Sequence, residues 1–269
     1  MITATVVRQL QRAKAELQVL TGAGAAVPDP VALFCAAFGA PDPWQEAVLR
    51  TDAPRLALNI TRQGGKSSVA AAKACHAALS ESGALVLVVS PSLRQSGELF
   101  RKILTVYGAA ARPVPPDSET KLTLELVNGS RVVSLPGKEG TIRGYSGVSL
   151  PLIDEASRVP DELYYSVRPM IAVSGGRLVT LSTPFGKRGW WYREWVDGGE
   201  TWRRFEVPAT DCPRISPAFL EEEQRSMGAL FFESEYECRF VETVDSVFSH
   251  ELVMAALSDE VAPLFGEVA

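Results

Sequence analysis

The residues with the clearest chemistry lie in one short loop, Arg62-Gln63-Gly64-Gly65-Lys66-Ser67-Ser68, between an apolar run at 56–60 and an alanine-rich run at 67–80. Backbone N–H groups around the two glycines can approach phosphate oxygens closely because no Cβ intervenes. The Lys66 amine can reach the β and γ phosphates, and the Ser67 hydroxyl can bind Mg²⁺. The N-terminus of the following helix adds a partial positive charge. The loop therefore predicts a site for ATP, with Gln63 and Ser68 among its contacts.

The loop departs in one place from the usual pattern G-x-x-x-x-G-K-[ST], because Ile60 stands where the first glycine is expected. The spacing from that position to Lys66 is nevertheless kept. A tight strand-to-helix turn that binds no ligand is the alternative interpretation of two glycines in this context.

A second candidate site is the acidic pair Asp154-Glu155, which directly follows the apolar run 148–153. A buried parallel strand would bring this pair to the carboxyl edge of a sheet, where open α/β proteins bind their ligands. Asp154 suits the magnesium shell, and Glu155 suits the orientation of an attacking water. A solvated strand end or a helix cap is the alternative. Pro151 counts against a central strand, because proline has no N–H for the ladder.

Two further positions could contact the nucleotide. Ser182 and Thr183 end a third strand-like run, at 177–182, where their hydroxyls could sense the γ-phosphate; a turn begun by Ser, Thr and Pro is the alternative. Gln45 lies just upstream of the loop, and its amide could pair with both the donor and the acceptor edge of adenine. An exposed helix glutamine is the alternative for this residue.

The composition excludes several classes of protein. With 269 residues, 46% hydrophobic and 22% charged, the chain can bury a large core and is too balanced for disorder. A net charge of −5 argues against a uniformly basic nucleic-acid binder, although it says nothing about local patches. The four cysteines are scattered without C-x-x-C spacing and there are two histidines, so a zinc site is not expected. The apolar runs are strand-length, which predicts a soluble intracellular protein without a membrane span.

The order of patterns predicts an α/β protein with a mostly parallel central sheet flanked by helices. We expect a helical arm at 1–40, the main core at 41–200, a small lid subdomain at 201–248 and a C-terminal tail at 249–269. The expected strands are 56–60, 84–89, 148–153, 177–182 and 202–207, with a hairpin of 121–126 and 131–135 at the sheet edge. The expected helices are 5–20, one opening at 43, 67–80, 93–107, 217–227 and 229–240.

Seven short motifs follow one another between Pro43 and Phe248. They are Pro43-Trp44-Gln45, Thr61-Arg62-Gln63-Gly64-Gly65-Lys66-Ser67, Val89-Ser90-Pro91-Ser92, Thr141-Ile142-Arg143-Gly144, Leu152-Ile153-Asp154-Glu155-Ala156, Leu181-Ser182-Thr183-Pro184 and Phe232-Glu233-Ser234-Glu235-Tyr236-Glu237-Cys238. As an ordered set they resemble the ATPase domain of the large terminase subunit of tailed bacteriophages, the motor that packages double-stranded DNA into a procapsid. The arginine early in the phosphate loop, here Arg62, is typical of that family.

The resemblance implies a P-loop NTPase fold of the ASCE type and assigns roles to the site residues. Gln45 would contact adenine, Arg62 and Lys66 the phosphates, Ser67 and Asp154 the magnesium ion, and Glu155 would activate water. Ser182 and Thr183 would form the coupling motif. Arg143 resembles the family's arginine finger, which would enter the site of a neighbouring subunit; a surface arginine in a loop is the alternative.

The resemblance also implies partners: double-stranded DNA, a portal protein, the small terminase subunit and a homo-oligomeric, pentameric ring in the host cytoplasm, with no membrane. Full-length large terminases carry a C-terminal nuclease domain, and this sequence ends at Ala269, so we expect ATP hydrolysis without DNA cutting. An isolated ATPase domain and a naturally shorter protein both remain open. A helicase-like remodelling ATPase, a nucleotide-switched scaffold with little turnover and, more remotely, a small-molecule kinase are the alternative functions.

The DNA contacts are not assigned by the sequence. The candidates are Arg94, Arg101, Lys102, Lys187 and Arg188, and a solvated surface charge is the alternative for each.

Overall fold

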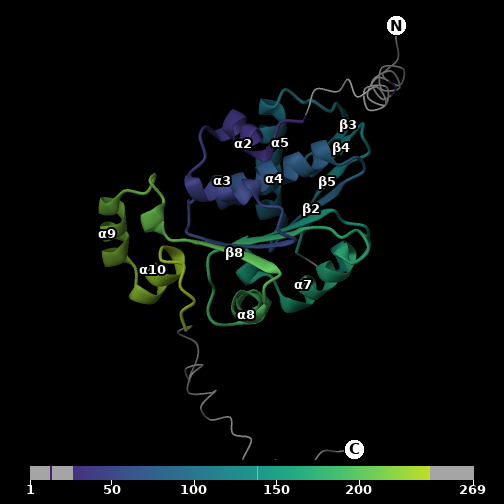
Figure 1. The fold of residues 1–269 in the computed structure, drawn as a ribbon. Coiled ribbons are helices and arrows are strands. Elements are labelled where there is room, and N and C mark those ends of the chain that lie inside the picture. Colours follow the sequence, from purple (N-terminus) through teal and green to yellow (C-terminus); the bar gives the residue numbers. More distant parts are fainter. Residues whose placement is uncertain (1–12, 14–26, 138, 243–269) are drawn as a thin grey trace, which may run out of the picture.

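The computed structural model of the chain describes residue 13 and residues 27–137 and 139–242, which form an α/β fold around one eight-stranded sheet (Figure 1). The strand order is β3-β4-β5-β2-β6-β7-β1-β8. The strands are β1 (Arg55–Ile60), β2 (Leu85–Ser90), β3 (Pro116–Glu119), β4 (Thr123–Leu126), β5 (Arg131–Pro136), β6 (Leu150–Asp154), β7 (Leu178–Ser182) and β8 (Trp202–Val207).

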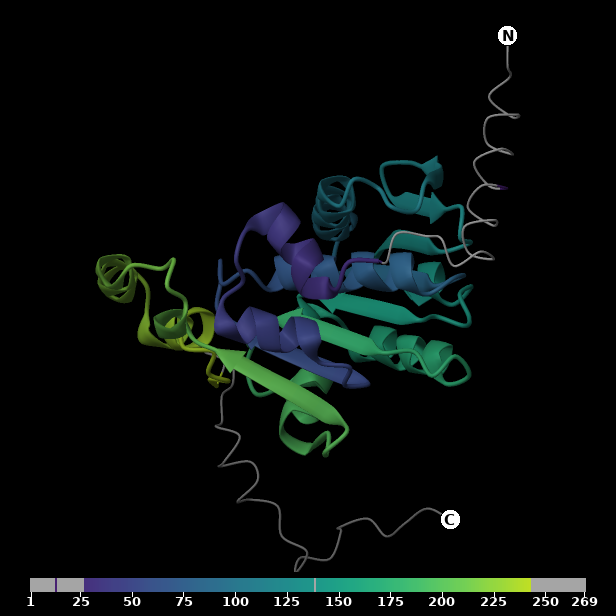
Figure 2. The ribbon, with the colours of Figure 1, turned by 45° about the horizontal axis from the view of Figure 1, so that its top comes forward.

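Helices cover both faces of the sheet. One face carries α2 (Pro30–Phe38), α3 (Pro43–Arg50), α4 (Lys66–Ser80) and α5 (Leu93–Ala109). The opposite face carries α7 (Asp161–Val167) and α8 (Gly189–Asp197), as Figure 2 shows from a second direction. The remaining short elements are α6 (Glu139–Ile142) and the 3-10 turns η1 (Ala156–Arg158), η2 (Arg168–Ile171) and η3 (Ala209–Asp211).

The two faces of the sheet are buried in separate apolar clusters. In β2, Val86 and Val88 pack under the first helical layer, whereas Leu87 and Val89 pack under the second. Successive side chains of a strand point to opposite faces, so a strand covered on both sides must be apolar throughout. This explains why the run 84–89 reads as continuously hydrophobic in the sequence.

The strands from β5 to β8 in the sheet order run parallel to their neighbours. Their carboxyl ends therefore share one edge of the sheet, which is where the phosphate loop, Glu155 and Thr183 follow β1, β6 and β7. The hairpin at 123–136 is antiparallel and lies toward the β3 end of the sheet, as expected from the Asn128-Gly129 turn.

Four features differ from the sequence expectations or were missed by them. The strand at 202–207, expected at the start of the lid, is instead β8 of the main sheet, paired with β1 along its length, so the sheet continues to Val207. Pro151 does lie inside a central strand, in register with Leu87, because pairing on both sides of β6 outweighs one missing donor. The short elements α2 and β3 were not anticipated.

The lid consists of η3, α9 (Pro217–Ser226) and α10 (Ala229–Glu235), and it projects from one side of the sheet (Figure 1). Its small core joins Ala209, Phe232 and Tyr236. Helix α10 ends at Glu235, not at the expected Phe240, and Cys238 then takes a left-handed conformation with φ of 59°. The expected helix at 5–20 and the tail at 249–269 lie outside the described residues, in which no helix is long and apolar enough to cross a bilayer.

A buried lysine joins α3 to α4 next to the phosphate loop. Lys73 is 9% exposed, and its amine donates to the carbonyls of Val48 (3.1 Å), Leu49 (3.2 Å) and Thr51 (2.8 Å). These are carbonyls at the end of α3, which have no partner within the helix. Lys73 thereby fixes the helix that carries Gln45.

Replacing Lys73 with methionine should lower the free energy of unfolding by about 2 to 4 kcal/mol, because three carbonyls lose a charged donor at a buried position. Urea unfolding measures this change. Lys121→Met, at an exposed position, is the control and should stay within about 0.5 kcal/mol of wild type. Equal stability of the two variants would contradict the capping role.

Candidate functional site

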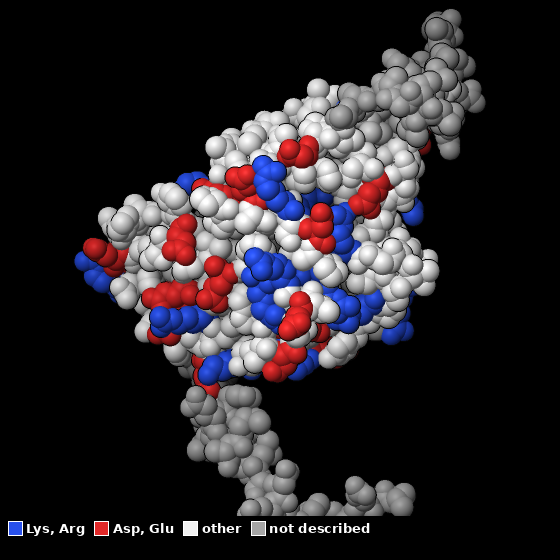
Figure 3. Space-filling model, in the orientation of Figure 1, with Lys and Arg blue, Asp and Glu red and all other residues white. Residues whose placement is uncertain are grey.

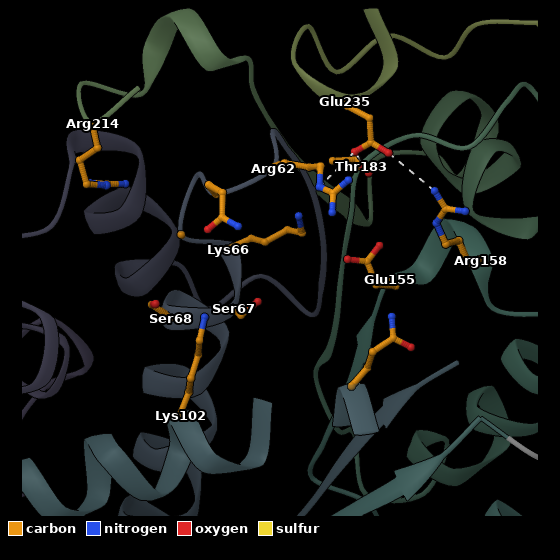
Figure 4. Close-up of a pocket in the computed structure, with 13 residues that line it drawn as sticks. Arg62, Lys66, Ser67, Ser68, Lys102, Glu155, Arg158, Thr183, Arg214 and Glu235 are labelled. Atoms are coloured by element: carbon orange, nitrogen blue, oxygen red, sulfur yellow. Dashed lines mark hydrogen bonds and ion pairs between the residues drawn. The ribbon is translucent and has the colours of Figure 1, made fainter. Parts of the chain in front are cut away.

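A cavity of about 620 Å³ opens at the carboxyl edge of the sheet, between the phosphate loop, α5, the turn after β6, the end of β7 and the lid (Figure 4). Its lining is polar and carries five cationic side chains against two carboxylates. A cavity of this kind favours a ligand with several negative charges. The lining residues are Arg62, Gln63, Gly65, Lys66, Ser67, Ser68, Gln95, Lys102, Glu155, Arg158, Thr183, Arg214 and Glu235.

The phosphate loop depends on both of its glycines. Gly65 adopts φ of +98°, a left-handed conformation that L side chains rarely take, and a Cβ there would lie 2.6 Å from the Gln45 Nε2 atom. A Cβ on Gly64 would lie 2.8 Å from Cγ2 of Ile60. The loop then runs directly into α4, whose first turn begins at Lys66. Free backbone N–H groups and the positive end of the helix therefore face the cavity.

The acidic pair lies where the sequence predicts, at the end of β6. Asp154 is 8% exposed, and its Oδ1 accepts a hydrogen bond from the Glu155 amide at 3.0 Å. Burial, reinforced by the Glu155 charge, raises the pKa of Asp154 to about 6, against the opposing effects of Lys66 and Lys102. Glu155 lines the cavity in a left-handed conformation with φ of 51°. A non-glycine residue held in this region is strained, and such strain is often found at functional sites.

Ser182 and Thr183 are bonded directly to the turn that follows the acidic pair. Ser157, in η1, forms a hydroxyl–hydroxyl hydrogen bond of 2.7 Å with Ser182 and donates to the Thr183 carbonyl at 2.8 Å. The Thr183 hydroxyl in turn donates to Glu235 of the lid at 3.1 Å. The end of β7 thus bridges the acidic pair and the lid.

Gln45 is buried and lies against the loop, although it is not among the residues that line the cavity. Its Oε1 accepts a hydrogen bond from the Asp42 amide at 2.8 Å and so caps α3. Asp42 also pairs with Arg214 of the lid, whose Nη2 donates to the Gly64 carbonyl at 2.9 Å. The structure thus gives Gln45 a capping role, and an adenine contact stays a prediction.

Arg143 is exposed and lies away from this cavity. It lines a different hollow of about 440 Å³, together with Tyr145, Tyr165, Met170 and other residues near α7. Within one chain the structure therefore does not bring Arg143 to the phosphate loop.

Five lining residues were not assigned to the site from the sequence: Gln95, Lys102, Arg158, Arg214 and Glu235. Lys102 was considered only as a DNA contact, although burial lowers its pKa and its charge interacts with those of Asp154 and Lys66. Glu235 belongs to one of the motifs of the sequence resemblance, but no role could be read from that motif. Arg158 follows Glu155 by three positions, which is the one local signal among the five.

Mg²⁺ would fit this site only together with a phosphate ligand. Within the described residues, no three His, Cys, Asp or Glu side chains cluster as a self-sufficient metal site. Mg²⁺ commonly uses one or two protein ligands, completed by water and substrate phosphates. Asp154 and the Ser67 hydroxyl are oxygen donors of the right type for such a shared shell.

The chain resembles known proteins over most of its length. Residues 58–253 match the family described as the terminase large subunit, T4-like-virus type, N-terminal. The large terminase ATPase domain of Thermus phage P74-26 superposes with a TM-score of 0.70 at 20% identity, covering 77% of this chain and 97% of that one. The large terminase of another thermophilic bacteriophage, in complex with ADP, has a TM-score of 0.65 at 15% identity. That of bacteriophage HK97 has a TM-score of 0.61 at 15% identity.

The match covers 75% of this chain and 54% of the ADP-bound large terminase, and 77% of this chain and 53% of the HK97 protein. The chain thus spans about half the length of these two relatives. No curated protein sequence matches it. At these identities the structural likeness concerns the fold, which agrees with the predicted α/β class.

The buried Asp154 carboxyl makes a prediction about stability. Its folded pKa of about 6 exceeds its ordinary value of 3.8, so its stabilising contribution is complete below pH 3.8 and is lost as pH rises through 6. Without nucleotide or Mg²⁺, Asp154→Asn should therefore be more stable than wild type at pH 7, by about 2 to 3 kcal/mol, and should lose this advantage near pH 4. Denaturant unfolding across this range measures the difference.

Asp117→Asn, at an exposed position of β3, is the control and should show a pH-independent difference of less than about 0.5 kcal/mol. An Asp154→Asn variant that is less stable than wild type at pH 7, or equally displaced at both pH values, would show that Asp154 carries no desolvation cost.

Proposed function

The chain belongs to the large terminase subunit family of the T4-like-virus type, and on this premise we propose that it is an ATPase that drives double-stranded DNA into a procapsid. The observation that carries the proposal is the convergence of the phosphate loop and Glu155 on one strongly cationic cavity. The large terminase of the second thermophilic bacteriophage, which shares this fold, has been crystallised with ADP and with ATP-γ-S.

In the proposed site the triphosphate lies along the loop from Arg62 to Ser68. Backbone N–H groups and the Lys66 amine bind the phosphates, Arg62 adds a second cation, and the adenine lies toward Gln45. Bound Mg²⁺, held by Asp154 and Ser67, would neutralise charge on the β and γ phosphates.

Glu155 would orient the attacking water in line with the bond to the leaving group. The water oxygen bonds to the γ phosphorus as the β–γ bridging bond breaks, which yields ADP, inorganic phosphate and a proton. Lys66 and Arg62 stabilise the charge that develops on the transferred group and on ADP. The strained backbone of Glu155 fixes its carboxylate on the cavity side of β6.

The coupling to movement would run through the end of β7. Ser182 is bonded to Ser157 in the turn after Glu155, and Thr183 is bonded to Glu235 in the lid. A change at the γ-phosphate can therefore reach the lid through two consecutive residues. This arrangement supports the proposed coupling role of Ser182 and Thr183.

The proposed partners are double-stranded DNA, a portal protein, the small terminase subunit and further copies of this chain in a pentameric ring in the host cytoplasm. The net charge of −5 does not oppose DNA binding, because charge is unevenly spread. Figure 3 shows Lys and Arg gathered over the middle of one face, near β8, with acidic side chains around them. Arg143 would act on the site of the adjacent subunit in such a ring.

A helicase-like remodeller would share the same nucleotide site. Unwinding of a forked duplex by this chain would favour that function, whereas transport along intact duplex DNA favours packaging.

Glu155→Gln should lower the ATP hydrolysis rate by a factor of about 10² to 10⁴ and leave ATP binding nearly intact, because the amide fills the same space but cannot orient and activate water. Lys66→Ala should impair both binding and hydrolysis. Phosphate release at saturating ATP gives the rate, and Glu222→Gln, at an exposed lid position, is the control. Negligible turnover by the wild type under all conditions, with intact binding, would indicate a nucleotide-switched scaffold instead.

Mixing Arg143→Ala with Glu155→Gln subunits should restore part of the activity that each variant lacks alone. One interface in a mixed ring then combines an intact Glu155 with an Arg143 from the neighbouring subunit. Phosphate release measured against the mixing ratio tests this expectation. No recovery, with mixed rings shown to assemble by mass, would contradict action between subunits.

A further inference from the structure

The carboxylate of Glu235, at the end of α10, connects the lid to three parts of the cavity. Its Oε1 lies 3.6 Å from Nη2 of Arg158, and its Oε2 lies 3.9 Å from Nε of Arg62. Oε2 also accepts the Thr183 hydroxyl at 3.1 Å. Figure 4 shows the two arginines approaching Glu235 from opposite sides.

Arg158 lies on the hydrolytic side of the cavity. It ends η1, the turn that directly follows Glu155, and its side chain lines the cavity while remaining 41% exposed. Its guanidinium carbon lies 4.1 Å from the centre of the Phe185 ring. Such stacking holds the plane of a guanidinium while its N–H groups stay free to change partners.

We propose that Arg158 is a phosphate-binding residue of this same chain, which leaves Glu235 and contacts the terminal phosphate when a nucleoside triphosphate enters. The inference depends on the proposed function, in that the cavity must bind a triphosphate. It adds a cation to the site from within the subunit, next to the residue that orients water. Glu235 is then a positioning residue that holds Arg158 in the absence of the third phosphate.

The exchange leaves no buried charge without a partner. When Arg158 moves away, Glu235 keeps the Thr183 hydroxyl and Arg62, and Arg158 keeps its contact with Phe185. A terminal phosphate carries more charge than one carboxylate and accepts the paired N–H groups of a guanidinium equally well. A diphosphate ends one phosphate short of this position, so Arg158 should distinguish ATP from ADP.

This role is distinct from those proposed for the other two arginines. Arg143 lines a different hollow and would act on a neighbouring subunit, whereas Arg158 belongs to the cavity of its own chain. Arg62 extends from the loop on the opposite side of Glu235 (Figure 4). The terminal phosphate would therefore meet one guanidinium from each side.

The test compares affinities for ADP and for a non-hydrolysable ATP analogue, both with Mg²⁺ and without DNA. Arg158→Ala should weaken binding of the analogue by about 10- to 100-fold and change ADP affinity less than about 3-fold. Unchanged ADP affinity also shows that the variant is folded. Arg158→Lys keeps the charge but loses the paired N–H groups, so its loss should be intermediate.

Arg188→Ala is the matched control. Arg188 stacks on the same Phe185 ring, with its guanidinium carbon 4.6 Å from the ring centre, but it does not line the cavity. Its loss should leave both affinities in place. A fall in analogue affinity equal to that of Arg158→Ala would assign the effect to packing around Phe185 and overturn the proposal.

Glu235→Gln tests the exchange itself. Without the competing charge, the analogue should bind several-fold more tightly, and adding Arg158→Ala should abolish this gain. A gain that persists in the double variant, or no gain at all, would contradict the exchange.

Two results separate the two proposals. Arg158→Ala that weakens ADP and analogue equally, or neither of them, would overturn the role of Arg158 while the proposed ATPase stands. A wild-type chain that binds neither ligand would overturn both.

Discussion

The rest of the site depends on one electrostatic constraint, a carboxylate buried beside two lysines at the carboxyl edge of a parallel sheet. Asp154 is 8% exposed, and the charges of Lys66 and Lys102 partly offset the cost of its burial. A buried carboxylate without such compensation would be protonated. The parallel pairing of β6 with β7, and of β7 with β1, brings the acidic pair and the phosphate loop to one edge. The sheet register and the charge pairing thus specify the same cavity.

The lid is bound to this cavity through its main chain as well as through the Glu235 side chain. The Glu235 carbonyl accepts the Arg62 amide at 3.1 Å and the Thr61 hydroxyl at 3.0 Å, and the Cys238 carbonyl accepts the Asn59 amide group at 2.7 Å. The end of α10 is therefore hydrogen-bonded to the end of β1 and to the first residues of the loop. A displacement of the loop by bound phosphate would act directly on the lid, which gives chemistry a short path to movement.

The local parts of the site could be predicted from the sequence, and the long-range parts could not. Gly64, Gly65, Lys66 and Asp154-Glu155 are recognisable because a short segment carries its own backbone geometry, apolar flanks and charge. Arg158, Arg214 and Glu235 reach the cavity only through folding: Arg214 bonds Gly64 across 150 positions and Glu235 bonds Thr183 across 52. The strand β8 was misplaced for the same reason, because its partner β1 lies far upstream and its exposed edge leaves no continuous apolar run.

A crystal structure of the chain with a non-hydrolysable ATP analogue and Mn²⁺ in place of Mg²⁺ tests the central claim most directly. The account predicts a triphosphate along residues 64–68, with the anomalous signal of the metal within coordination distance of the Asp154 carboxylate and the Ser67 hydroxyl. A triphosphate bound elsewhere would contradict it, for example in the second cavity of about 420 Å³ lined by Lys73, His76 and Arg177. A metal signal remote from Asp154 would contradict it equally.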